Sequence, residues 1–315
     1  MNENAASRIF KTYGIYIAFA VLIIVISIAA PAFLQGQNII NIVRQSSMIG
    51  IIGFGMTFVI ISGGIDLSVG SVLAFSGIIG CSLAQQDSTT PLAFAILAGI
   101  GVGAMFGFIN GFLIARVRLA PFIVTLAMMS LIRGWCMVIT DGRPVINISE
   151  SYASIAGKIE VAGIPLPIIV FIGIIALYAF ILYKTRFGRH VYAIGGNEQS
   201  AMVSGINVGF VKTMVYTIVG ISSAVSGILL TSRVMTASPV LGEGYELNAI
   251  AAVVIGGTSL SGGVGGIWGT VVGVMIMGCI NNGLDLMHVS SYYQQIIWGI
   301  IILIAVFLDR KKALT

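Results

Sequence analysis

Long apolar runs separated by short polar segments fill most of this chain of 315 residues. A helix needs about 20 mostly apolar residues to cross a bilayer, whereas the strands of a membrane barrel alternate over only about ten. Backbone groups in hydrocarbon must also be hydrogen-bonded internally, which a helix achieves by itself. The pattern therefore predicts an all-α, polytopic membrane protein. We expect about ten spans, within a range of about eight to eleven: 14–34, 47–63, 68–85, 91–115, 121–140, 165–183, 209–231, 247–257, 267–284 and 292–308.

The organisation of the chain follows from these runs. Residues 1–315 are interpreted as one transmembrane domain, with the first six runs in 14–183, a polar segment at 184–208, and the last four runs with a short tail in 209–315. The eighth run, 247–257, is too short to cross as written. It either extends back through Glu246 or forms a half-helix that does not cross.

The charged residues indicate how the chain is oriented. Only 9% of the residues are charged, and the mean hydropathy is +1.05, whereas soluble domains carry about a quarter charged residues. Loops rich in Lys and Arg stay in the cytoplasm. With the N-terminus inside and about ten crossings, most of the 16 Lys and Arg lie on the inner side, so both termini are expected to be cytoplasmic. The net charge of +5 is then a topology signal, and no nucleic-acid partner is expected.

The polar segment contains the stretch GRHVYAIGGNEQSAMVSGINV, which has the signals of a short helix. Asn197 is a good N-cap, Glu198 suits the first turn, and Gly205 is a natural stop. Asn207 is then placed to cap the next span. The helix would have about seven residues, and two turns are unstable alone in water, so we expect it to dock on something.

Two interpretations of this helix remain open. It is either an ordinary capped loop packed on its own membrane domain, or a contact for a soluble subunit that carries force into the helices on both sides. Gly195 and Gly196 would let the backbone turn sharply and lie close to a partner.

Several motifs together resemble one family. They are TRFGRHVYAIGGNEQSAMVSGINV, SGGIDLSVGS at 62–71, GYELNAIAAVVIGGTSLSGGVG at 244–265, NNGLDL at 281–286 and VSSYYQ at 289–294. In this order they resemble the permease subunit of bacterial ABC importers for monosaccharides, the ribose permease group. The resemblance extends nearly from end to end.

The resemblance implies a set of partners. Two permease copies, expected as a homodimer, form the pore in the lipid of the bacterial inner membrane. A periplasmic binding protein delivers the sugar, and a cytoplasmic ATPase subunit binds ATP and Mg and drives the cycle. Ribose is favoured, with xylose, galactose, allose and arabinose as alternatives. The implied contact with the ATPase comprises Gly195, Gly196, Asn197, Glu198, Gln199, Ser200, Ala201, Met202, Ser204 and Gly205.

The residues offer no catalytic set, so the chain is not expected to be an enzyme. It has no G-x-x-x-x-G-K-[ST] phosphate loop, and its only histidines, His190 and His288, fall in different loops on opposite sides. The three cysteines lie inside apolar runs without metal-ligand spacing. No cofactor or metal is therefore expected in this chain. Many of the 40 glycines suit close helix packing instead, for example Gly99, Gly103 and Gly107.

Asp66 lies between two apolar runs and has two readings. A carboxylate at bilayer depth is expensive and suggests a functional role, whereas Asp66 or Ser68 near the inner face would simply cap the third span. We favour the cap. A shift of 193 residues aligns Gly63, Gly64, Leu67, Ser68 and Gly70 with Gly256, Gly257, Leu260, Ser261 and Gly263, with Ser259 opposite Asp66. This repeated pattern predicts related helix breaks in the two halves of the chain. Broken helices commonly flank transport pathways.

Other polar residues in or near the spans are candidates for the path. Asn110, Asn281 and Asn282 would contact sugar hydroxyls or, as we favour, join helices. Arg133 would snorkel outward or pair with an acidic residue. The candidates for the path or for a helix break are Asp66, Ser68, Asn110, Ser259, Ser261, Asn281 and Asn282. On the outside, Glu243, Tyr245 and Glu246 are candidates for docking of the binding protein.

Competing transporter classes predict features that are weak here. An ion-coupled secondary transporter of a small polar solute, the principal alternative, predicts carboxylates that form a relay within the spans. A channel predicts a selectivity loop or a ring of charges. An importer driven by a partner ATPase explains the polar segment, the outer acidic loop and the missing phosphate loop together.

Overall fold

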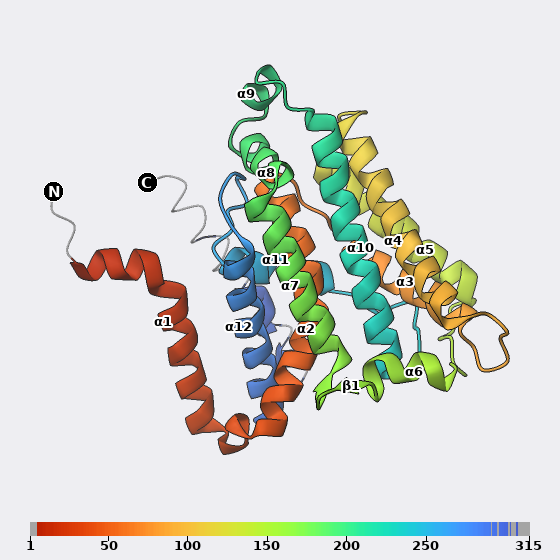
Figure 1. The fold of residues 1–315 in the computed structure, drawn as a ribbon. Helices are drawn as coiled ribbons and strands as arrows, with labels where there is room; N and C mark the ends of the chain where they lie inside the picture. The colour runs from red at the N-terminus through yellow and green to blue at the C-terminus, as the bar shows by residue number, and fades with distance from the viewer. Residues whose placement is uncertain (1–4, 291, 295, 302, 304–306, 308–315) are drawn as a thin grey trace.

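The computed structural model describes residues 5–290, 292–294, 296–301, 303 and 307 (Figure 1). The protein is an all-α membrane protein, and its only strands form one short hairpin within the described part. The helices before the polar segment are α1 (Ala5–Ala29), η1 (Pro31–Leu34), α2 (Gly36–Ile61), α3 (Val69–Leu83), α4 (Leu92–Ala115), α5 (Pro121–Thr140), α6 (Glu150–Gly157) and α7 (Leu166–Lys184). The hairpin pairs β1 (Glu160–Val161) with β2 (Ile164–Pro165). The remaining helices are α8 (Arg186–Gly196), α9 (Glu198–Val203), α10 (Val208–Val234), α11 (Tyr245–Ile255) and α12 (Ile267–Leu286).

Most of the predicted apolar runs are helices with nearly the predicted bounds. The predicted end of the first span at 34 and the predicted start of the second at 47 were wrong, because α1 ends at Ala29 and α2 begins at Gly36. Two polar side chains of this stretch, Asn38 and Arg44, have hydrogen-bond partners, which allows the helix to include them. The amides of Asn38 and Asn282 exchange hydrogen bonds of 2.8 and 2.9 Å, and the guanidinium of Arg44 donates to the carbonyl of Ala156.

Helix length divides the described helices into two groups. Six are long and apolar enough to cross a membrane: α2, α4, α5, α7, α10 and α12. The run 247–257 extends back through Glu246, one of the two predicted alternatives, but α11 has 11 residues and at about 16 Å is too short to cross by itself. Of the predicted last span, residues 295, 302, 304–306 and 308 lie outside the described residues, and the described ones are helical. The positively charged tail at 310–312 also lies outside them.

The core of the molecule is built around α2 and α10. These two helices are buried along most of their length, whereas the outward faces of α4, α5 and α7 remain exposed. The predicted close packing at the glycines of α4 is confirmed, and the structure shows that the partner is α10. A Cβ at Gly103 would lie 2.5 Å from the carbonyl oxygen of Gly220 and 2.5 Å from the Cβ of Ala224. Small residues thus allow the two backbones to approach closely.

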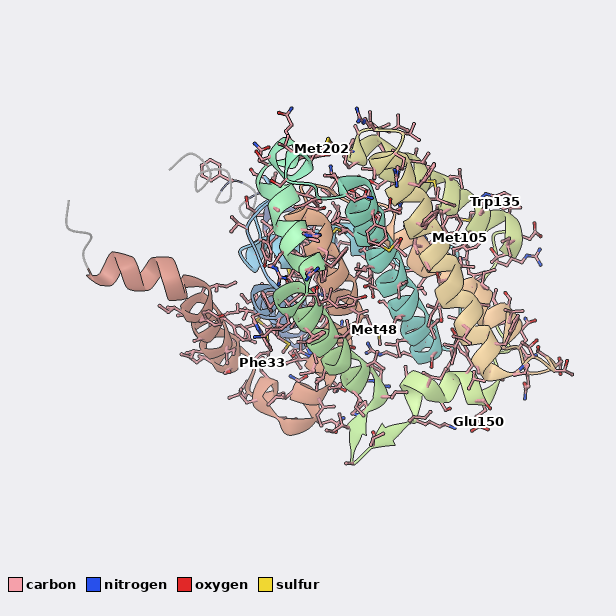
Figure 2. All side chains as sticks on the ribbon, turned by 45° about the horizontal axis from the view of Figure 1, so that its top comes forward. Phe33, Met48, Met105, Trp135, Glu150 and Met202 are labelled. Carbon is pink, nitrogen blue, oxygen red and sulfur yellow. The ribbon has the colours of Figure 1, made fainter. Side chains whose placement is uncertain are left out.

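The two ends of the bundle carry different structures. α9 lies at one end, called the α9 end, and α6 with the hairpin lies at the other, the α6 end (Figure 1). Figure 2 shows Met202 and Glu150 at these opposite ends. At the α6 end, Ser149 caps α6 through the N–H of Tyr152, and Lys158 pairs with Glu150 at 2.6 Å. The hydrogen bond and the charge of Lys158 lower the pKa of Glu150, although both groups are exposed.

We expect Gly103→Ala to destabilise the protein by about 1–3 kcal/mol, because the added methyl group meets a backbone carbonyl that cannot move independently. Gly101→Ala is the matched control, since a Cβ there meets nothing within 4 Å. The measurement is the midpoint of thermal unfolding in detergent. Equal midpoints for the two variants would contradict the close α4–α10 contact.

Candidate functional site

The polar segment 184–208 folds into two short helices whose ends are capped by side chains. Thr185 accepts the N–H of Gly188 at 3.2 Å, and Asn197 accepts the N–H of Ser200 at 2.8 Å. Asn207 accepts the N–H of Phe210 at 3.0 Å and so caps α10. Gly205 follows α9 with a φ of +82°, in the left-handed region that favours glycine. The predicted capped helix is confirmed as α9, with six residues.

Sequence reasoning missed α8, the longer of the two helices. Gly195 and Gly196 were expected to form a turn, but they are the last two residues of α8. Gly188, Val191 and Ile194 are its buried residues. These residues are three positions apart, a spacing that places them on one face of a helix. This pattern could have predicted α8 from the sequence.

Gly195 lies at a close junction of three backbone segments. A Cβ on Gly195 would overlap the carbonyl oxygen of Ile61, the last residue of α2. The same carbonyl accepts the N–H of Gly263 at 2.9 Å. A Cβ on Gly262 would lie 3.2 Å from the Cα of Gly63. This arrangement, which we call the glycine junction, joins the end of α8 to the loops that follow α2 and α11.

Tyr192 adds a side-chain link at the same place. Its hydroxyl donates to the carbonyl oxygen of Gly265 at 2.8 Å, so α8 is also tied to the loop before α12. Burial raises the pKa of Tyr192 to about 12, with a smaller contribution from Tyr183. The phenol therefore keeps its proton and its donor role at neutral pH.

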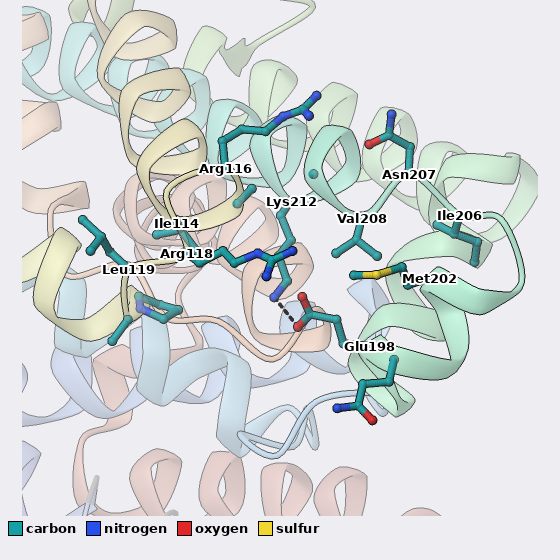
Figure 3. A pocket seen from close by; sticks show the side chains of 15 residues that line it. Ile114, Arg116, Arg118, Leu119, Glu198, Met202, Ile206, Asn207, Val208 and Lys212 are labelled. Carbon is teal, nitrogen blue, oxygen red and sulfur yellow. Dashed lines mark hydrogen bonds and ion pairs between the residues drawn. The ribbon is translucent and has the colours of Figure 1, made fainter.

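α9 is tied to α10 by an ion pair. Lys212 Nζ lies 2.6 Å from Glu198 Oε2, and Figure 3 shows this pair beside Arg118. The pair borders a cleft of about 960 Å³ between α9, the start of α10 and the loop 116–121. Because Glu198 is about half exposed, the pair adds little stability, but it links α9 to the buried helix α10.

The predicted contact residues divide into an outer and an inner set. Gly195 packs inside the glycine junction and Ala201 is buried, so neither residue is accessible to a partner protein. The most exposed large apolar side chain here is Val203 at 90%, which lies within the predicted region 195–205 but was not among the predicted contact residues. The outer set comprises Gly196, Asn197, Glu198, Gln199, Ser200, Met202, Ser204 and Gly205.

Asp66 lies in a buried polar cluster within the loop between α2 and α3. Its Oδ1 accepts the N–H and the hydroxyl of Ser68 at 2.8 and 2.6 Å, and the amide of Asn110 donates to the Ser68 hydroxyl oxygen at 2.8 Å. Ser68 occupies the N-cap position of α3, but its side chain accepts no helix N–H. The predicted cap is therefore wrong, because neither Asp66 nor Ser68 accepts an N–H of α3, and the cluster instead holds the loop to α4.

The second loop repeats this arrangement in part. Gly63 and Gly257 follow α2 and α11 with φ of +79° and +90°. The side chain of Ser259 accepts the N–H of Ser261 at 3.3 Å, just as the side chain of Asp66 accepts the N–H of Ser68. Gly63 and Gly257 are 194 positions apart in the sequence, whereas the turns formed by Asp66 and Ser259 are 193 positions apart. The predicted helix breaks are thus present in both halves.

The remaining candidates serve packing or lie elsewhere than expected. Asn282 joins α12 to α2, and Asn281 is half-buried. Arg133 forms no salt bridge within the described residues: its Nη1 donates to the carbonyls of Pro239 and Leu241 at 2.5 and 2.9 Å, and its charge acts on the carboxylate of Glu246.

The expected docking residues do not share one outer surface. Glu243 is exposed, but Tyr245 and Glu246 are half-buried. The carboxylate of Glu246 faces Gly70 at the start of α3. Docking of a delivery protein stays a prediction for Glu243, whereas the inward position of Glu246 does not fit it.

These features define a class: a multi-pass helical membrane protein with broken helices and a short capped helix exposed at one end. The chain belongs to the family described as "Branched-chain amino acid transport system / permease component", which matches residues 38–306. It is therefore a permease, a transport component of the inner membrane rather than an enzyme.

Individual relatives match nearly the whole chain. Ribose import permease protein RbsC of Bacillus subtilis (strain 168) is 48% identical over 306 residues, which is 97% of this chain and 94% of the relative. RbsC of Escherichia coli (strain K12) is 44% identical over 94% of this chain and 92% of its own. D-allose transport system permease protein AlsC of the same organism is 39% identical, with coverage of 95% and 91%. No solved structure matches.

We expect Gly195→Ala to lower the thermal midpoint of the protein and Gly196→Ala to leave it nearly unchanged. The first methyl group would overlap the carbonyl oxygen of Ile61, whereas the second meets nothing within 4 Å. The expected cost of the first change is about 1–3 kcal/mol, typical of an overpacked site. If the neighbouring glycines tolerate alanine equally, the glycine junction is not a tight contact.

Proposed function

We propose that this chain is the membrane-spanning permease of an ATP-driven importer of monosaccharides, with ribose as the favoured sugar. The observation that carries the proposal is the 48% identity to a ribose import permease over 97% of the chain. The 39% identity to a D-allose permease keeps other monosaccharides as alternatives. The sugar itself is selected largely by a separate binding protein.

The proposed assembly contains two copies of this chain, a cytoplasmic ATPase and a periplasmic binding protein. The exposed face of α9, with Met202 and Val203 as its apolar residues, is the proposed contact for the ATPase. ATP and Mg would bind to that partner, since this chain has no phosphate loop. The α6 end is the proposed side for the binding protein, because the proposed topology places that end in the periplasm.

The proposed topology has about ten crossings, with both termini and the α9 end in the cytoplasm. Its support is the distribution of basic residues, which gather at the α9 end: Arg116, Arg118, Lys184, Arg186, Arg189 and Lys212. The α6 end carries acidic residues and would face the periplasm.

The proposed mechanism is alternating access driven by movement of α8 and α9. Closure of the ATPases would shift α9 and, through the adjoining Asn197, the end of α8. At the same time α8 would move the glycine junction and therefore both broken-helix loops. Backbone contact transmits displacement directly, because packed interiors shift between discrete arrangements rather than stretch. The path between the two copies would then open to the other side.

We expect Val203→Arg to reduce sugar-stimulated ATP hydrolysis at least about tenfold in vesicles that hold the permease, the ATPase and the binding protein. A charge placed in a desolvated contact lacks a partner and weakens docking. Val161→Arg, at an exposed valine of the hairpin at the other end, is the matched control. Normal stimulation in the Val203→Arg vesicles would count against the ATPase contact, and robust ATP turnover by the purified permease alone would remove the proposal.

We expect a cysteine at Ser200 to resist an impermeant thiol reagent in intact cells and to react after the inner membrane is opened. Ser151→Cys, exposed on α6, should react from the periplasm. The three native cysteines are buried and give little background. Labelling of Ser200→Cys from outside intact cells would invert the proposed topology.

A further inference from the structure

The two half-helices α3 and α11 begin at the same place inside the bundle. α3 runs from Val69 toward the α6 end, where the carbonyl of Ala84 accepts the N–H of Ser149. α11 runs from Tyr245 toward the α9 end, where its following loop enters the glycine junction. Their starting turns touch, because a Cβ on Gly70 would overlap the carbonyl oxygen of Gly242.

The lengths of the two helices place this contact deep in the membrane. α3 has 15 residues and spans about 22 Å, and α11 has 11 residues and spans about 16 Å. Together they cover about 38 Å, close to the thickness of a bilayer, whose hydrocarbon core is about 30 Å thick. Each end of the bundle is thus separated from the contact by one half-helix.

The segment that leads into α11 is held inside the bundle. The guanidinium of Arg133 donates to the carbonyls of Pro239 and Leu241 and so fixes this segment to α5. Gly242 and Gly244 follow with positive φ, which lets the backbone pass close to α3.

The carboxylate of Glu246 lies at this contact. Its Oε2 faces Gly70, and its Oε1 accepts the N–H of Gly244 at 3.2 Å. Within the described residues it has no salt bridge and accepts no hydrogen bond from another side chain, although the positive charge of Arg133 acts on it. A carboxylate at this depth is costly, and such residues commonly mark substrate pathways.

We propose that Glu246 is a binding subsite for sugar hydroxyls at the midpoint of the path. Its oxygens would accept hydrogen bonds from adjacent hydroxyls of the sugar, which replace the solvation that the carboxylate lacks. The starts of two broken helices surround it, as in other transporters that bind substrate near the midplane. The glycines at the contact let the half-helices separate to admit the ligand. This subsite rests on the proposed function, since the path must carry a monosaccharide.

The test uses the complete reconstituted importer and compares ribose with 2-deoxyribose. We expect Glu246→Gln to slow ribose uptake and to shrink the preference for ribose over the deoxy sugar by about tenfold or more, because a site built for a hydroxyl rejects an analogue that lacks it. The preference is expressed relative to wild type, so the contribution of the binding protein cancels.

Glu160→Gln is the matched control, because this carboxylate is exposed on the β1–β2 hairpin, away from the contact of α3 with the segment before α11. We expect it to keep the wild-type preference. Glu246→Asp, which keeps the charge, should restore part of the preference even if the glutamine variant is produced poorly. A slowed uptake with unchanged preference in both Glu246 variants would overturn the subsite and leave Glu246 as support for α11. Absence of monosaccharide uptake by the wild-type importer would instead remove the proposed function itself.

Discussion

The contact between the end of α8 and the end of α2 constrains the rest of the structure. Gly195 lies so close to the carbonyl of Ile61 that no side chain fits between the two backbones, and the same carbonyl binds the N–H of Gly263. α8 therefore cannot move without moving the loops that follow α2 and α11. A long side chain at such a joint would absorb part of a displacement by changing its rotamer, whereas backbone atoms in contact have no comparable freedom.

The two loops at this joint lead to helices of different kinds. After the first loop comes α3, which is short and buried, and after the second comes α12, which is long enough to span. α11, before the second loop, is the other short helix. One half-helix, α3, follows its loop, and the other, α11, precedes its loop. The start of α3 at Gly70 contacts Gly242, just before α11 begins. A movement applied at the α9 end has a direct route along α11 to this inner contact.

Local signals predicted the parts of the site that depend on neighbouring residues. The caps at Asn197 and Asn207 were predictable, because a side-chain oxygen needs only an N–H three residues away. The short run at 247–257 likewise indicated a half-helix by its length. Contacts between distant segments were not predictable in this way. The amide pair of Asn38 and Asn282 joins residues 244 positions apart, and neither residue identifies the other.

The sequence by itself determined that the chain is a helical membrane protein with breaks in both halves and a capped helix between its main groups of spans. Apolar run length, glycine and capping residues act within a few positions, so composition and spacing contain this information. Only the tertiary structure decided that Gly195 faces inward, that Arg133 binds carbonyls, and that Glu246 meets α3 inside the bundle. These outcomes depend on which helix packs beside which, because a buried polar group takes whichever partner the packing brings within hydrogen-bond distance.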